Sequence, residues 1–316
     1  MENQVKQEMS LTKPSKDNYE HAKQDLLHME HHIAKLNEQH SNTTLEKNTK
    51  EEEEDKLNSD YQELIKLGWD VDIINTSQRS EIINKVNSED YFFVHVHYDK
   101  FYDILDKLDC SNIAFTSHYP YINDKQFHDN DNYTPIFKFM TSQTSYYNFV
   151  LAEKDKKYLL EYGANENNIN ILKNGASTKD FKFESECKYK DKTICLGKIT
   201  RRKRQYYLQN INQKYNTGIE FIGSNNDNNF NMNLGDFKGE WSKDKLYTNL
   251  TKYANLVLLS EGEADPLVVK EALVSGLGVV VSESSSAYLD RTKDFINVIK
   301  NSDIKDENII NNIIKR

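Results

Sequence analysis

After Asp60 the chain alternates short runs of β-branched and aromatic residues with longer stretches of helical composition, and this alternation restricts its fold more than any other feature. Enough residues separate successive runs for a helix or a long crossover, and strands joined in that way lie parallel. The first series therefore predicts a parallel sheet with covering helices. Its expected strands are Val71 to Asn75, Tyr91 to His97, Asn112 to Ser117, Phe149 to Ala152 and Ile169 to Leu172.

A second series of the same kind follows a turn at Asn174-Gly175 and the charged stretch from Lys182 to Lys192, which has the composition of a linker. The chain is therefore expected to be an α/β protein with two Rossmann-like lobes, residues 61–181 and 182–316. The expected strands of the second lobe are Thr193 to Gly197, Ile219 to Gly223, Leu256 to Ser260 and Val279 to Ser282, with helices at Lys243 to Tyr253 and Pro266 to Ser275.

Residues 1–60 are rich in Glu, Lys, Asn, Gln and His, and they carry too few apolar side chains to build a core. They predict a helical, partly disordered extension. Within residues 19–36, apolar side chains recur at spacings of three and four, as in the seam of a short coiled coil. This helix could support self-association or docking onto a lobe, or it could be an ordinary surface helix. His28 and His32 lie one turn apart on it and are better explained as a solvated face than as metal ligands.

Bulk properties limit the possible functions. A chain of 316 residues with 37% hydrophobic content is long enough for two domains. It contains no apolar run of membrane-spanning length and its first residues are polar, so a soluble, cytoplasmic protein is expected. Three cysteines without paired spacing indicate reduced thiols. The net charge of -9 argues against nucleic acid as a partner.

Two loops follow expected strands, at the carboxyl ends where parallel sheets bind ligands. Residues 198–204 hold five cations in seven positions, which indicates a local anionic partner, although an exposed basic patch or a nuclear-import signal is the alternative. Residues 261–265 bring three carboxylates to the start of a helix that Asp265 can cap and that Gly276 can end. Cations and a helix N-terminus suit a diphosphate, and carboxylates suit sugar hydroxyls, so the combination predicts a nucleotide-sugar site.

The segment from Ser260 to Gly276 resembles the signature of family 4 glycosyltransferases, in which seven residues separate two glutamates, here Glu263 and Glu271. Lys198 and Lys203 resemble the arginine and lysine of the family's strand-end loop, although Lys198 lacks the bidentate fork of an arginine. The turn from Asn174 to Phe181 also resembles the one that closes the N-terminal lobe in this family.

This resemblance implies the GT-B fold, a nucleotide-sugar donor, retention of the anomeric configuration, and no requirement for a metal or another cofactor. It implies that Lys198 and Lys203 stabilise the leaving diphosphate, that Glu271 holds the donor ribose, and that Glu263 lies near the transferred sugar. It also implies donor contacts from the backbone at Pro266, Leu267 and Val268.

In the first lobe His118 follows an expected strand and resembles the family histidine that faces the transferred sugar. His97 ends another strand, and either histidine could instead have a structural role. The tripeptide Asp129-Asn130-Asp131 has the pattern of a metal-binding motif, but such tripeptides are expected by chance in a chain rich in Asn and Asp.

Members of the family normally begin with a buried strand and a glycine-rich loop, whereas residues 1–60 contain no glycine. The resemblance predicts sugar transfer to a glycan, lipid or protein acceptor. The missing glycine-rich loop leaves two alternatives open. One is a catalytically weak nucleotide-sugar-binding or regulatory protein. The other is a coiled-coil interaction module for which the lobes are scaffold.

Overall fold

The computed structural model describes residues 67–74, 76–96, 98–124 and 133–315. The predicted extension, with the apolar seam at residues 19–36 and the pair His28 and His32, lies outside these ranges, as do His97 and the tripeptide from Asp129 to Asp131. The chain divides into two compact units. Of the described residues, unit 1 contains those up to residue 96 and residues 103–113, and unit 2 contains Tyr98–Tyr102 and those from residue 114 to residue 315.

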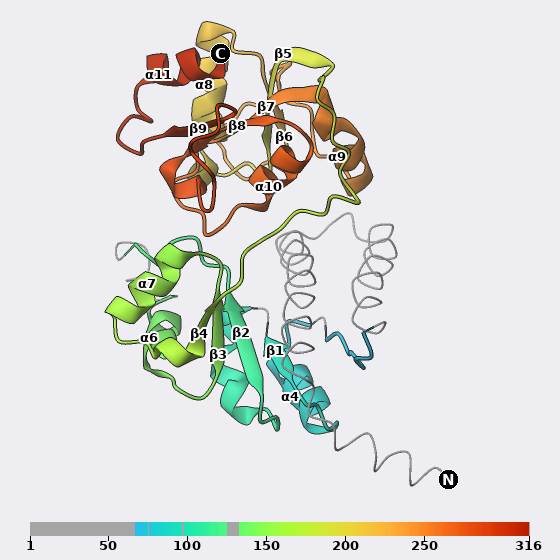
Figure 1. The fold of residues 1–316 in the computed structure, drawn as a ribbon, viewed down its shortest axis with the longest axis vertical. Coiled ribbons are helices and arrows are strands. Elements are labelled where there is room, and N and C mark those ends of the chain that lie inside the picture. Colours follow the sequence, from blue (N-terminus) through green and yellow to red (C-terminus); the bar gives the residue numbers. More distant parts are fainter. Residues whose placement is uncertain (1–66, 75, 97, 125–132, 316) are drawn as a thin grey trace. The chain divides into compact units, whose positions relative to one another are not determined.

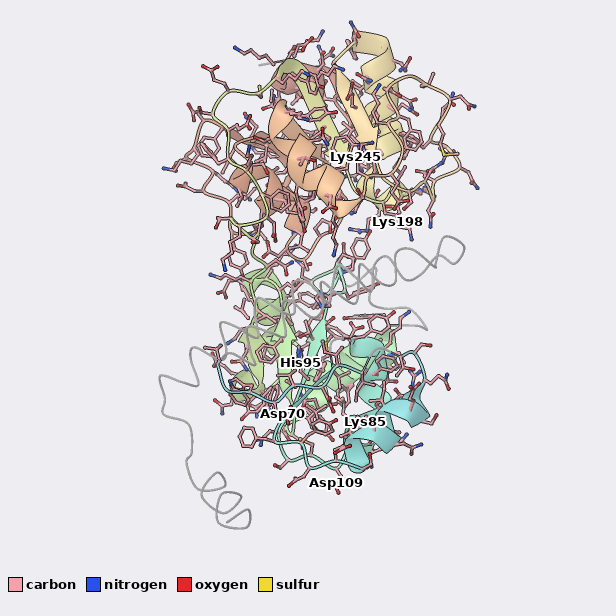
Figure 2. All side chains as sticks on the ribbon, turned by 90° about the vertical axis from the view of Figure 1, so that its right-hand side faces the viewer. Asp70, Lys85, His95, Asp109, Lys198 and Lys245 are labelled. Atoms are coloured by element: carbon pink, nitrogen blue, oxygen red, sulfur yellow. The ribbon has the colours of Figure 1, made fainter. Side chains whose placement is uncertain are left out.

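Unit 1 contains helix α4 (Arg79–Asn87) and strand β1 (Val94–Val96), and helix α4 turns Ile82 and Val86 into the interior. The β1 strand is held by a hydrogen bond from Val94 N to Asn112 O of 2.9 Å. Residues 71–74 form no strand, which corrects the expectation for Val71 to Asn75. Among the described residues the segment has no strand partner for its backbone, and it is held instead by side-chain contacts of Asp72, which pairs with Lys85 at 3.2 Å and accepts from the Tyr91 hydroxyl. Figure 2 labels Lys85 in this unit and Lys198 in unit 2.

Three neighbouring parallel strands, β2 (Ile113–Ser117), β3 (Tyr147–Val150) and β4 (Ile169–Ile171), follow in that order, and all their residues except Ile113 belong to unit 2. All five residues of β2 are buried, as expected for a parallel strand covered on both faces. The 3-10 helix η1 (Asp99–Lys107) precedes β2. Helix α6 (Thr134–Ser142) lies between β2 and β3, and α7 (Glu153–Glu161) with the short 3-10 helix η2 (Glu166–Asn168) lies between β3 and β4. The βα repetition read from the sequence is thus confirmed.

The second sheet of unit 2 has five parallel strands in the order β6-β5-β7-β8-β9. One face is covered by α9 (Lys243–Asn249) and α10 (Leu267–Val274), which bury Leu246, Val269 and Ala272 against it. The other face is covered by α8 (Gln205–Tyr215) and α11 (Glu307–Ile314), which bury Leu208 and Ile310 (Figure 1). The strands are β5 (Tyr189–Leu196), β6 (Ile219–Ile222), β7 (Tyr253–Leu258), β8 (Gly278–Ser282) and β9 (Ile296–Ile299).

The strand order creates a switch point between β5 and β7. From β5 the chain moves outward to β6, and it then returns to the other side of β5 to form β7 and continue to β8 and β9. Loops that leave the carboxyl ends of β5 and β7 therefore diverge to opposite faces, and such a point is where open α/β sheets bind ligands. The cationic loop, residues 198–204, and the carboxylate loop, residues 261–265, are these two loops.

Several boundaries differ from the sequence-based expectation. β5 begins at Tyr189, inside the stretch expected to be a linker. The helix expected up to Tyr253 ends earlier, as α9 and the short 3-10 helix η4 (Leu250–Lys252), because Tyr253 already belongs to β7. The sequence did not predict β9 or α11. Within the described ranges, no helix has both the length and the apolar character needed to cross a bilayer.

Candidate functional site

The cationic loop is built around Gly197 and Gln205. Gly197 has φ +123°, and a Cβ there would lie only 3.1 Å from Lys203 Nζ, so the bare glycine lets the ammonium group lie against the backbone. Gln205 is fully buried; its Oε1 accepts from Thr200 N at 3.1 Å and its Nε2 donates to Lys198 O at 3.0 Å. Thr200 in turn caps the 3-10 helix η3 (Arg201–Lys203) through a bond from Lys203 N. The loop is therefore held in a defined shape.

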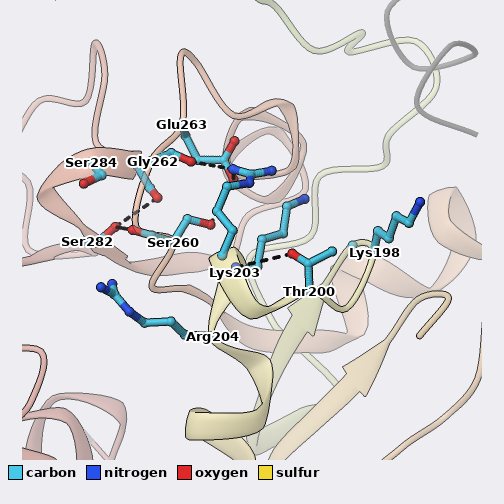
Figure 3. A network of polar contacts seen from close by, with 12 residues as sticks. Lys198, Thr200, Lys203, Arg204, Ser260, Gly262, Glu263, Ser282 and Ser284 are labelled. Atoms are coloured by element: carbon cyan, nitrogen blue, oxygen red, sulfur yellow. Dashed lines mark hydrogen bonds and ion pairs between the residues drawn. The ribbon is translucent and has the colours of Figure 1, made fainter. Parts of the chain in front are cut away.

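The two lysines assigned to the diphosphate both belong to this loop. Lys203 is 8% exposed and Lys198 is half-buried. In the orientation of the Asn226 amide that satisfies its hydrogen bonds, its oxygen accepts from Lys198 Nζ at 3.3 Å. Figure 3 shows both lysines extending from the loop on the side of Thr200. The loop thus directs two ammonium groups to the carboxyl edge of the second sheet.

The two arginines 202 and 204 have partners within the protein. Arg202 Nη1 pairs with Glu263 Oε1 at 2.7 Å and also donates to Gly262 O, while Ser260 Oγ donates to the same Glu263 oxygen at 2.9 Å (Figure 3). Arg204 pairs with Glu261 at 3.4 Å. The sequence-based prediction gave the dense charge of this loop an external anion as partner. These two arginines instead neutralise carboxylates of the loop that follows β7, which lies next to β5 in the sheet.

Helix α10 begins one residue later than expected. Pro266 is the N-cap residue, with extended backbone and no side-chain cap, so Leu267 and Val268 are the first two helical residues. The prediction that Asp265 caps this helix is wrong. Its Oδ2 instead accepts from Asn174 N at 2.9 Å, and its Oδ1 pairs with Lys270 Nζ at 3.0 Å. The exit of the helix at Gly276, with φ +88°, is as expected.

Glu271 lies within α10 and is 2% exposed. Glu271 is thus one of three buried residues of the helix, with Val269 and Ala272. Glu263, by contrast, lies in the loop before the helix and keeps part of its surface accessible. The two glutamates that carry the sequence signature therefore have different environments: Glu263 is fixed by an ion pair at the loop, and Glu271 is buried in the helix.

A second buried carboxylate lies close to Asp265. Asp155, in the first turn of α7, is 1% exposed, and neither of its carboxylate oxygens accepts a hydrogen bond. Burial, opposed by the ammonium of Lys154 and assisted by the negative charge of Asp265, raises the pKa of Asp155 to about 7. Burial likewise raises the pKa of Asp265. These two carboxylates therefore compete for the nearby positive charge.

His118 follows β2, and Tyr121 in the same loop contacts the carboxylate loop. A Cβ on Gly262 would lie 2.3 Å from Tyr121 Cε1 and 3.1 Å from Pro120 O, so the ring rests directly on the glycine. The His118 residue retains some exposure, but its Nε2 is buried, and burial lowers the pKa of His118 to about 4. Near neutral pH the imidazole is therefore uncharged. The structure thus brings the loop of His118 beside that of Glu263.

The loop of His118 is anchored by a buried polar network. Ser117 Oγ donates to Asp99 Oδ2 at 2.6 Å and lies 3.1 Å from the Tyr133 hydroxyl. Tyr119 stacks on Tyr133 with ring centroids 3.6 Å apart. Burial raises the pKa of Asp99 to about 6. This network fixes the end of β2 immediately before His118.

Among the described residues no group of three His, Cys, Asp or Glu side chains could hold a metal ion. The three cysteines are free thiols, and Cys195 is buried, where its pKa rises to about 12.

Comparison with known proteins identifies the fold. No protein-family model matches the chain, and no curated protein matches its sequence. Among solved structures it is similar to HepE of Anabaena in complex with UDP-glucose, at 12% identity over 81% of this chain and 78% of HepE, with a TM-score of 0.59. It is also similar to sucrose-phosphate synthase of Thermosynechococcus elongatus, at 16% identity over 72% and 64% of the two chains, with a TM-score of 0.57. A third similar structure is an E. coli trehalose-6-phosphate protein bound with UDP-2-fluoro glucose, at 13% identity over 75% and 68%, with a TM-score of 0.54.

These neighbours are glycosyltransferases of one architecture. The chain has the GT-B fold. The expected fold class is therefore confirmed, and in the GT-B fold of this chain the cationic and carboxylate loops flank the switch point of the second sheet.

Sequence reasoning missed three residues that shape the site, Gln205, Tyr121 and Lys154, and it gave Arg202 an external anion as partner instead of Glu263. Gln205 stands next to a motif that was recognised, so its position was a usable signal. Tyr121 and Lys154 offered none, since their partners lie more than 100 positions away along the chain.

Proposed function

We propose that the chain is a glycosyltransferase that transfers a sugar from a nucleotide-sugar donor to an acceptor with retention of the anomeric configuration. The observation that carries the proposal is the meeting of the cationic and carboxylate loops at the switch point of a parallel sheet, with Lys203 lying over Gly197. The likeness to HepE, crystallised with UDP-glucose and with UDP and glucose, favours a uridine diphosphate donor.

Each site residue has a role that its chemistry can perform. Breaking the bond between the anomeric carbon and the diphosphate oxygen places negative charge on the leaving diphosphate. Lys198 and Lys203 would stabilise that charge, and preorganised cations in a partly buried site do so effectively. The amides at the start of α10, at Leu267 and Val268, would add hydrogen bonds to the phosphate or the sugar.

The carboxylates and the histidine would orient the donor. Glu271 would accept hydrogen bonds from the ribose hydroxyls, and Glu263 would lie near the transferred sugar with its carboxylate already fixed by Arg202 and Ser260. His118, held neutral by burial, would exchange a hydrogen bond with a sugar hydroxyl rather than carry charge. None of these roles calls for a metal, and we propose that transfer proceeds without one.

A second candidate is a nucleotide-sugar-binding protein with weak transfer activity. The observation that favours it is the absence of any glycine before Gly68, since a glycine-rich turn lets donor and acceptor approach the backbone closely. This candidate shares the donor site with the enzyme and differs only in the positioning of the acceptor.

A combined binding and turnover experiment separates the two. Binding of UDP, UDP-glucose, UDP-N-acetylglucosamine and the corresponding guanosine compounds is measured by thermal shift and calorimetry, because a ligand of the folded state raises its melting temperature. Donor consumption is then followed by mass spectrometry with glycan, lipid and protein acceptors, with and without EDTA. Transfer unaffected by EDTA supports the enzyme, and binding without turnover supports the second candidate. If no nucleotide raises the melting temperature, both are wrong.

A further inference from the structure

Lys154 occupies a position that its own helix does not favour. It lies in the first turn of α7, between Glu153 and Asp155, where the partial positive charge of the helix N-terminus attracts anions and repels cations. A lysine at this place therefore needs acceptors elsewhere. Its neighbour Lys157, one turn further along the helix, is exposed.

The acceptors of Lys154 lie at the carboxyl ends of strands of the second sheet of unit 2. Lys154 Nζ donates to the backbone oxygen of Glu263 and lies 3.5 Å from that of Ser284. These carbonyls belong to the segments that follow β7 and β8, which are neighbouring strands. One ammonium group thus ties two adjacent strand ends to α7.

Two further contacts hold this region: one joins α7 to the segment after β8, and the other joins the segment after β4 to the carboxylate loop. The Tyr288 hydroxyl accepts from Glu153 N at 3.0 Å, and Tyr288 has the left-handed backbone conformation, with φ +58°, that non-glycine residues adopt only at an energetic cost. Asn174 binds Asp265 through both its backbone and its side chain. The backbone strain at Tyr288 persists only where the surrounding contacts enforce it.

We propose that Lys154 is a positioning residue for Glu263. This inference rests on the proposed function. The Glu263 carboxylate is fixed by Arg202 and Ser260, and its backbone is fixed by Lys154, so the residue is held from two sides. The nearby carboxylate of Asp265 adds electrostatic attraction for this ammonium group. Because small misplacements of site groups can lower a rate about 100-fold, loss of Lys154 should impair turnover more than nucleotide binding.

The test compares Lys154→Met, which keeps the length but not the charge, with Lys154→Arg and with the matched control Lys157→Met on the exposed side of the same helix. In Lys154→Met we expect kcat to fall tenfold or more while the Kd for UDP stays within threefold. Lys154→Arg should recover a large part of kcat, and Lys157→Met should behave like the wild type. Melting temperatures measured in parallel establish that the variants are folded.

A second readout does not depend on activity. Hydrogen exchange of the amides of residues 260–266 should accelerate in Lys154→Met and remain unchanged in Lys157→Met. Unchanged exchange together with unchanged kcat would overturn the positioning role, and so would a loss of UDP affinity that equals the loss of kcat. If the wild type neither binds nor consumes nucleotide sugars, the proposed function fails, while faster exchange would still support the contact between Lys154 and the carboxylate loop.

Discussion

Adding a single methyl group at Gly262 tests whether the loop of His118 rests on the carboxylate loop. In Gly262→Ala the new Cβ would lie 2.3 Å from Tyr121 Cε1 and 2.5 Å from Cδ1. Carbon atoms in contact are normally separated by about 3.5–4.0 Å, so the ring must move by more than roughly 1 Å. The backbone oxygen of Pro120, at 3.1 Å, limits movement of the whole loop.

The magnitude follows from two opposing effects. Forcing extra volume into a packed contact costs about 1–3 kcal/mol. Replacing glycine by alanine also reduces the freedom of the unfolded chain, which returns about 0.4–1 kcal/mol. Because the Tyr121 ring is only half-buried and can turn toward solvent, we expect a net loss of about 1–2 kcal/mol.

Urea unfolding of a set of variants measures this loss. In the background Tyr121→Phe, which keeps the ring, Gly262→Ala should cost as much as in the wild type. In the background Tyr121→Ala, which removes the ring, the cost should be smaller by more than about 0.5 kcal/mol, the deviation from additivity beyond which two sites are coupled. Equal costs in all three backgrounds would refute the contact between the loop after β2 and the loop after β7.

Three further predictions concern charge and assembly. Lys203→Ala should weaken UDP binding by about 1.5–3 kcal/mol, the usual contribution of a hydrogen bond to a charged group, and calorimetry should show a much smaller effect on uridine. Asp155 has a pKa of about 7 in the folded chain and an ordinary value of 3.8, so the folded state binds more protons between these values and stability falls as the pH rises. Asp155→Asn removes this effect. The free energy of unfolding of this variant, relative to that of the wild type, should therefore rise by roughly 2–3 kcal/mol as the pH rises from about 5 to about 8, and a pH-independent difference in urea unfolding would contradict this. Deleting residues 1–45 should leave UDP affinity intact and change the oligomeric state seen by light scattering, whereas loss of UDP binding would assign this segment a role in the fold.

Most of the fold could be predicted from the sequence because its signals are local. A run such as Val279 to Ser282 is strand-forming by composition, and the helix after Pro266 ends at Gly276 because glycine adopts the left-handed exit at no steric cost. The positions of both charged loops after strands were equally visible. Strand β9 was missed because Ile296–Ile299 is short and mixes polar with apolar residues.

The tertiary structure alone decided which charges meet. Whether Arg202 contacts a ligand or Glu263 depends on β5 and β7 being neighbours, and strand order is not encoded in the local pattern of either strand. For the same reason Asp265, which the sequence predicts to cap α10, instead accepts a hydrogen bond from the Asn174 backbone. The sequence by itself thus determined the elements and the chemistry of their loops, since propensity and periodicity act within a few residues. The partners of Arg202, Asp265, Tyr121 and Lys154 required the folded chain, because packing brings together residues that are 60 to 141 positions apart.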